Sequence, residues 1–246
     1  MSIDNKTLAR VRAILAKAED PAASPEEAET YFAKAAELMA KYGIERAMLA
    51  DTKPETDRPA DRKITVGGSY VLDRVALLGS ITSALGGQSV RWRTYDPTTG
   101  KYVQVVHLYG YESTLDRVEL LYTSLLLQAF NGMKHGRPRP GESTTAYRKT
   151  WLAGFRNAIY ERLVAAERRA VEEAQPETGG RSAALVLADR AAVIKRRFEA
   201  DHPRVRMAPK RRLTGSGWSA GNEAGKRADL GTGTRLGAGP RAALVG

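Results

Sequence analysis

The chain has 246 residues, of which 42% are hydrophobic, so it can bury a sizeable core in one large domain or two modest ones. It contains no Cys, which excludes disulfides, a thiol nucleophile and Cys-ligated metals. No window approaches ~18 uninterrupted apolar residues, and residues 1–20 lack the apolar run of a secretory signal, so we expect a cytoplasmic protein without a membrane span.

The net charge of +11 is distributed unevenly. Residues 1–62 carry 10 basic and 12 acidic side chains, residues 63–175 carry 15 and 10, and residues 176–246 carry 14 and 6. A basic C-terminal part suits a polyanionic partner, because each Lys or Arg beside a phosphate releases counterions. The alternative is a solvated segment that only keeps the protein soluble.

Residues 1–50 have the pattern of a helical hairpin. Apolar residues recur at helical spacing over residues 5–18, and a proline-containing break follows. Ser24 and Glu27 then form a capping box, and we expect the second helix to end at Gly43. The outer face is acidic, so this part suits a protein partner better than nucleic acid.

A longer motif lies within this hairpin. The string LAKAED…SPEEAETYFAKAAELMAKYGI, over residues 6–45, resembles the N-terminal motif of an uncharacterised family of bacterial and phage proteins, a domain of unknown function. A second uncharacterised domain commonly follows in that family, and residues 64–175 are similar to it in the order of their elements. The resemblance implies an organisation and a bacterial or phage setting, and no activity or catalytic residues.

Residues 51–63 are rich in Pro and charge, which predicts a linker between domains. Beyond it we expect an α+β domain over residues 64–200. Its first part is a helix, a β-hairpin and a second helix. The expected ranges are 71–85 for the helix, 88–94 and 102–109 for the strands of the hairpin (88–109), and 113–130 for the second helix.

Two further helices are expected at about 145–174 and 183–200. Aromatic residues every four positions in the first of them are typical of a core face. A basic, glycine-rich extension follows over residues 201–246. The predicted fold class is therefore α+β and mostly α.

The stretch GSGWSAGNEAGKRADLG, residues 215–231, contains partial matches to three active-site motifs. Its GxSxG match has no His downstream of Ser219 to act as a base. Its approach to a phosphate-binding loop has wrong spacing and no Ser or Thr after Lys226, and its GxGxxxG differs from a dinucleotide fingerprint. We expect instead a short helix over about 220–228 whose small residues face a neighbour.

Several basic segments are candidate phosphate contacts. In the hairpin, two arginines should lie on the face opposite Trp92, beside tyrosines, which resembles a stacking platform for single-stranded nucleic acid. The alternative there is a charged face that protects an edge strand. The candidate nucleic-acid-binding residues are Arg91, Arg93, Lys134, Arg137, Arg139, Lys195, Arg196, Arg197, Lys210, Arg211, Arg212 and Trp218, the last as a stacking residue or an anchor onto the core.

The sequence predicts no catalytic residue, metal ligand or cofactor. The chain has three histidines, at 107, 135 and 202, and none has the spacing of a metal site. The favoured hypothesis is a non-catalytic nucleic-acid-associated accessory protein that binds DNA or RNA through its basic C-terminal part. The alternatives are a protein-interaction module whose hairpin docks a partner, and a metal-dependent hydrolase or nuclease built from dispersed carboxylates.

Overall fold

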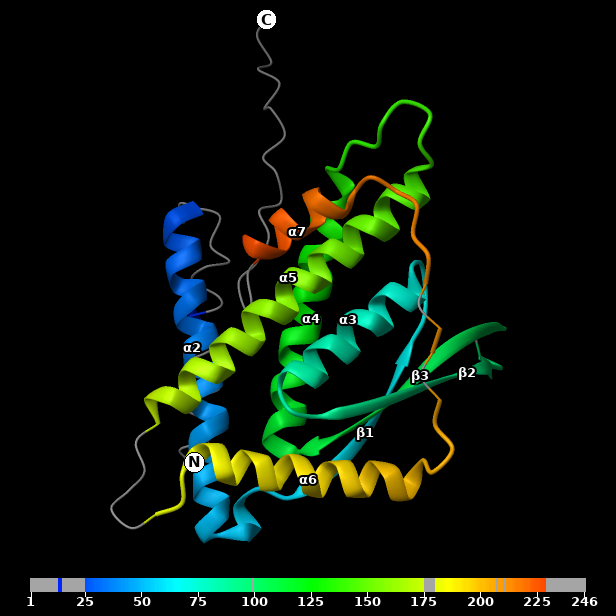
Figure 1. Cartoon of the computed structure of the whole chain (residues 1–246). Helices are drawn as coiled ribbons and strands as arrows, with labels where there is room; N and C mark the ends of the chain where they lie inside the picture. Colours follow the sequence, from blue (N-terminus) through cyan, green and yellow to red (C-terminus); the bar gives the residue numbers. More distant parts are fainter. Residues whose placement is uncertain are drawn as a thin grey trace, which may run out of the picture.

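The computed structural model describes residues 13–14, 25–98, 100–174, 180–206, 208–209 and 211–228 (Figure 1). Within them lie six helices and a three-stranded antiparallel sheet, so the predicted fold class is confirmed. The elements are α2 (Pro25–Thr52), the 3-10 helix η1 (Pro54–Thr56), β1 (Pro59–Val66), α3 (Val71–Ala84), β2 (Gln88–Asp96), β3 (Lys101–Tyr111), α4 (Glu112–Lys134), α5 (Thr144–Glu173), α6 (Ala183–Asp201) and α7 (Trp218–Lys226).

The sheet has the strand order β1-β3-β2. The hairpin of β2 and β3 was predicted, whereas β1 was not, and its residues 59–63 fall in the segment expected to be a linker. The charged sequence PADRK lacks the apolar pattern that predicts a strand, because β1 is an edge strand that begins with Pro and exposes alternate side chains. Ile64 and Val66 supply its inward face.

Helices cover both faces of the sheet. Val106 and Leu108 of β3 are buried in the core cluster together with residues of α3 and α4. The alternate residues His107 and Tyr109 point to the opposite face, where Tyr109 contacts Phe198 of α6. The helices α5 and α7 form further layers outside α3 and α4 (Figure 1).

The helix α2 extends to Thr52 and does not end at Gly43 as predicted. Gly43 is buried within the helix, where the guanidinium of Arg117 from α4 lies against it. A Cβ at this position would overlap that guanidinium. The helix α2 packs against α5 and α6. The first helix of the predicted hairpin lies outside the described residues except for residues 13–14.

The glycine-rich stretch forms α7, which packs closely on α5. The sequence predicted a short helix here, over about 220–228, with its small residues facing a neighbour, but it did not identify that neighbour. A Cβ at Gly225 would lie 2.6 Å from the carbonyl oxygen of Phe155, and one at Gly221 would overlap the carbonyl of Trp151. The spacing of four residues places these glycines on one face, so the backbones of the two helices approach closely. The glycines therefore serve packing, while Ser219, two residues before Gly221, is exposed.

Candidate nucleic-acid interface

The distal end of the β-hairpin exposes aromatic and basic side chains. Tyr95 and Tyr102 are paired directly across the two strands and are 54% and 61% exposed. Their ring centroids are 5.5 Å apart, with an angle of 70° between the planes. Lys101 beside them is also exposed, and over residues 88–111 the only carboxylate in the sequence is Asp96. The hairpin end therefore combines positive charge with accessible rings.

The two hairpin arginines lie on the face opposite Trp92, as the alternation predicted, since Arg91 pairs with Val106, Trp92 with Val105 and Arg93 with Gln104. The guanidinium of Arg93 lies over the ring of Tyr102, 3.9 Å from its centroid. Arg91 donates a hydrogen bond to the side-chain oxygen of Gln104 at 3.0 Å. Both arginines remain exposed, and these contacts hold them in place.

A basic connector, residues 202–217, joins α6 to α7, and its sequence contains no carboxylate. At one end His202 Nε2 lies 3.0 Å from the hydroxyl of Tyr109 on the α6 face of the sheet. Further along, Arg211 forms an ion pair of 2.8 Å with Asp73 in the first turn of α3, on the other face. The connector thus passes from one face to the other, on the hairpin side of the molecule (Figure 1).

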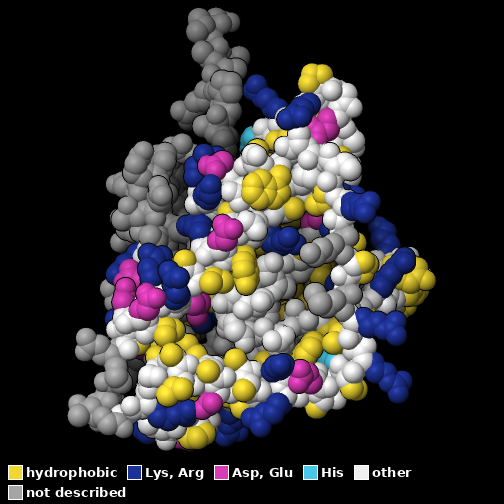
Figure 2. Space-filling view, in the orientation of Figure 1, with side chains coloured by type: hydrophobic (Ala, Val, Ile, Leu, Met, Phe, Trp, Pro, Cys, Tyr) yellow, Lys and Arg dark blue, Asp and Glu magenta, His cyan; other side chains and the backbone are white. Residues whose placement is uncertain are grey.

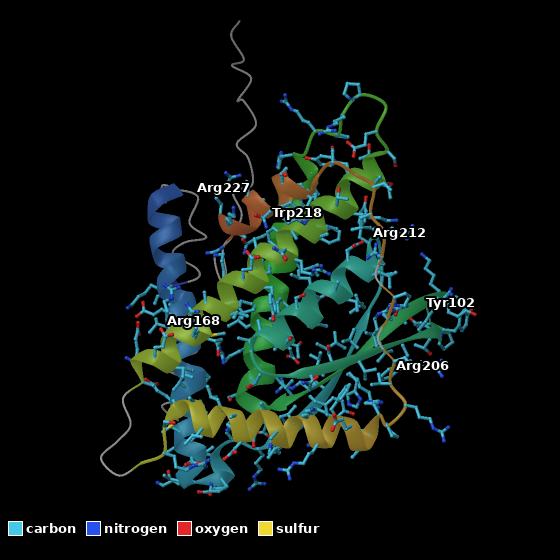
Figure 3. All side chains as sticks on the ribbon, viewed as in Figure 1. Tyr102, Arg168, Arg206, Arg212, Trp218 and Arg227 are labelled. Carbon is cyan, nitrogen blue, oxygen red and sulfur yellow. The ribbon has the colours of Figure 1, made fainter. Side chains whose placement is uncertain are left out.

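Cations of the connector lie at the same edge as the hairpin. Arg204, Arg206 and Arg212 are exposed, and Figure 3 shows Arg206 and Arg212 on the side of the molecule where Tyr102 projects. Figure 2 shows dark-blue Lys and Arg side chains along this edge. We call this set the hairpin–connector surface: Arg93, Tyr95, Lys101, Tyr102, Arg206 and Arg212.

A polar network that the sequence did not predict fixes the start of the connector. The hydroxyl of Tyr109 donates to Asp201 at 2.9 Å and lies 3.0 Å from His107 Nδ1, and His107 Nε2 lies 2.8 Å from Asp61. Burial, followed by the hydrogen bond to Asp201, raises the pKa of Tyr109, so the phenol stays protonated. In the sequence, the alternation of His107 and Tyr109 along β3 is the pattern from which this network could have been predicted.

Two of the predicted contacts form ion pairs with acids of other elements, and a third, Lys195, pairs with Glu199 of its own helix. Arg197 pairs with Asp61 and donates to the carbonyl of Pro59, which attaches α6 to β1. Arg211 pairs with Asp73, as described above. Lys195 and Arg196 are exposed on α6, where Lys195 lies 3.8 Å from Glu199. The basic clusters therefore contain two cations that tie elements together through ion pairs, although both side chains stay partly exposed.

The predicted loop cations lie at another end of the molecule. Lys134, Arg137 and Arg139 are exposed at the end of α4 and in the loop before α5, which lies far from α6 in Figure 1. Glu142 in this loop accepts hydrogen bonds of 2.6 Å from both the backbone N–H and the hydroxyl of Ser216. These bonds lower the pKa of Glu142 and tie the loop to the connector.

The remaining predicted residues are Trp218 and Lys210. Trp218 begins α7 and is 48% exposed, and its backbone carbonyl lies against Gly154 of α5. Figure 3 shows Trp218 on α7, away from the hairpin. Lys210 lies outside the described residues.

In the part of the chain that the structure describes, no group of three or more His, Asp or Glu side chains is placed to hold a metal ion. Among the same residues, no helix combines the length and apolar character needed to cross a bilayer.

Comparison with known proteins identifies a family for the N-terminal part of the chain. The family described as "Protein of unknown function (DUF2786)" matches residues 6–46. The chain has an N-terminal DUF2786 domain. No curated protein and no solved structure matches the chain. The suspected family of unknown function is thereby confirmed for these residues, and nothing identifies the rest of the chain.

The described part of the DUF2786 domain is integrated with the later helices. Tyr42, Gly43 and Ile44, from the KYGI end of the motif, are buried. Beneath Gly43, Arg117 forms a buried ion pair with Glu167 of α5. Burial raises the pKa of Glu167, although the charge of Arg117 opposes the shift. The motif glycine thus makes room for a charged side chain of α4 within the core.

Proposed function

We propose that the protein is a non-catalytic nucleic-acid-binding accessory protein of bacterial or phage origin, which binds through the hairpin–connector surface. The observation that carries the proposal is the stack of Arg93 on the exposed ring of Tyr102. Exposed connector cations lie on the same side of the molecule. Exposed rings interleaved with cations suit a ligand that has both phosphates and bases.

The exposed cations differ in role from the paired ones. Arg197 and Arg211 already neutralise Asp61 and Asp73, so they support the fold, and the proposal assigns them no phosphate. Arg93, Arg206 and Arg212 are exposed and can release counterions when a phosphate approaches. The proposal therefore predicts an affinity that depends steeply on salt.

The test is a salt series with the full chain and fluorescently labelled DNA and RNA oligonucleotides, read by anisotropy. Changing Arg93, Arg206 and Arg212 to Gln should make the slope of log affinity against log salt shallower by about 2–3 units, since each lost phosphate contact removes roughly 0.7–0.9 units.

The matched control changes Arg168, Arg169 and Arg227 to Gln, which removes the same charge. All three are exposed, and Figure 3 shows Arg168 and Arg227 on the side away from Tyr102. Equal slopes for the two triple variants would contradict the proposal, as would a wild-type chain that binds no oligonucleotide at low salt.

A further inference from the structure

We propose that the hairpin–connector surface takes a single strand, whose bases stack on Tyr102 and Tyr95. This inference rests on the proposed function and specifies its ligand. The two rings are held before any ligand arrives, because they contact each other across the strands and Arg93 covers Tyr102. Each tyrosine nevertheless is more than half exposed as a residue, at 54% for Tyr95 and 61% for Tyr102. They are thus fixed in position and open to a further stacking partner.

The competing ligand is a duplex, since a two-stranded β-ribbon can enter a major groove and read base edges with arginine. The contacts in this hairpin argue against that mode. Arg93 lies over Tyr102, and Arg91 donates to Gln104, so bidentate reading of a base edge would require both guanidinium groups to leave these partners, whereas a phosphate can approach the N–H groups that remain free.

The tyrosine rings are the accessible feature, and in a duplex the faces of the bases are already stacked on one another. The bases of a single strand have free faces that can stack on the tyrosine rings. A single strand therefore gains stacking energy from these rings, and a duplex does not. Connector cations on the same side of the molecule can follow the backbone of such a strand.

The experiment compares a short oligothymidylate with a duplex of the same length, using the full chain at one salt concentration. Tyr102→Ala should weaken binding of the single strand about 5- to 150-fold and leave binding of the duplex within about twofold, because stacking contributes about 1–3 kcal/mol per base. Tyr102→Phe should bind the single strand like wild type, since stacking does not need the hydroxyl. Leu127→Ala, at a side chain of α4 that is 62% exposed, is the control for loss of surface apolar area.

The outcomes separate this inference from the proposed function. A selective loss with Tyr102→Ala supports single-strand stacking. An equal loss for both ligands, or no loss for either, overturns the stacking inference while binding by the wild-type chain upholds the proposed function. Absence of binding by the wild-type chain to either ligand overturns both. Because Tyr102 is exposed, its variants should fold, which far-UV circular dichroism checks.

Discussion

At the scale of single residues, Asp57 joins three segments that are distant in sequence. It accepts hydrogen bonds from the backbone N–H and the hydroxyl of Ser113, at 3.0 and 2.7 Å, and thereby caps α4. It also forms an ion pair with Arg190 of α6, and its side chain is fully buried. Asp57 lies in the stretch that the sequence predicted to be a linker. The Pro- and charge-rich composition of that stretch therefore did not reveal a residue that holds three segments together.

Asp57→Ala should destabilise the protein by about 3–5 kcal/mol, because it leaves the charge of Arg190 and the donors of Ser113 without their partner. Urea unfolding followed by circular dichroism measures the loss. The control is Asp189→Ala, which removes an exposed ion pair with Arg181 and should cost about 0–1 kcal/mol. Similar losses for the two variants would mean that the Asp57 network contributes little.

The ionisation of Asp61 should make the stability of the fold depend on pH. The hydrogen bond from His107, assisted by the charge of Arg197, lowers the pKa of Asp61 in the folded state despite partial desolvation. A lowered folded-state pKa contributes stability above the unfolded-state pKa, and this contribution is lost as the pH falls through the folded-state value. Asp61→Asn should therefore be less stable than wild type at neutral pH.

The difference between Asp61→Asn and wild type should shrink toward acid, which unfolding curves at several pH values would measure. Asp189→Asn is the control for removing an exposed carboxylate. A difference that stays constant down to acid pH would show that the charge of Asp61 is not what stabilises the fold.

At the scale of elements, the packing of α7 on α5 depends on the absence of side chains. Gly221→Ala should destabilise the protein by about 1–3 kcal/mol, because the new methyl group overlaps the backbone carbonyl of Trp151, although Ala favours a helix over Gly. Chemical unfolding measures the change. Ser219→Ala, exposed on the same helix, should differ from wild type by less than about 0.5 kcal/mol. A stabilised Gly221→Ala would mean that the two helices separate without cost.

The elements that sequence could predict are those whose periodicity is strong. The helices α3 to α6 and the hairpin follow their apolar patterns, and their observed bounds lie close to the expected ones. The strand β1 escaped because an edge strand with Pro and alternating charge reads as a linker. Gly43 was misread as a helix end because the sequence does not reveal that Arg117 lies against it.

Sequence could place candidate cations but could not say which of them face solvent. Arg197 and Asp61 are far apart in the chain, as are Arg211 and Asp73, so their pairing depends on the folded arrangement. The exposed stack of Arg93 on Tyr102 is more predictable, since both residues flank one short hairpin turn. Contacts within the hairpin could thus be predicted from the sequence, whereas the ion pairs that engage Arg197 and Arg211 could not.

At the scale of the whole molecule, the exposed cations form separate groups. The hairpin–connector surface lies beside the sheet, whereas Lys134, Arg137 and Arg139 lie around the loop between α4 and α5 at another end (Figure 1). The bonds between Glu142 and Ser216 link this loop to the far end of the connector. The loop is therefore fixed relative to the connector, and its distance from the hairpin decides whether one ligand reaches both groups.

Changing Lys134, Arg137 and Arg139 to Gln should leave the salt slope for a short oligothymidylate within about 0.5 units of wild type, because a strand seated on the hairpin does not reach the loop. The triple variant of Arg93, Arg206 and Arg212 removes the same number of charges and should lose about 2 units on the same single strand. The comparison controls for net charge, since both variants lower it by the same amount and long-range attraction alone would weaken them equally. Anisotropy titrations over a salt series measure both slopes. If the loop variant loses as much slope as the hairpin variant, the phosphate contacts extend beyond the hairpin–connector surface, and the interface must include the loop between α4 and α5.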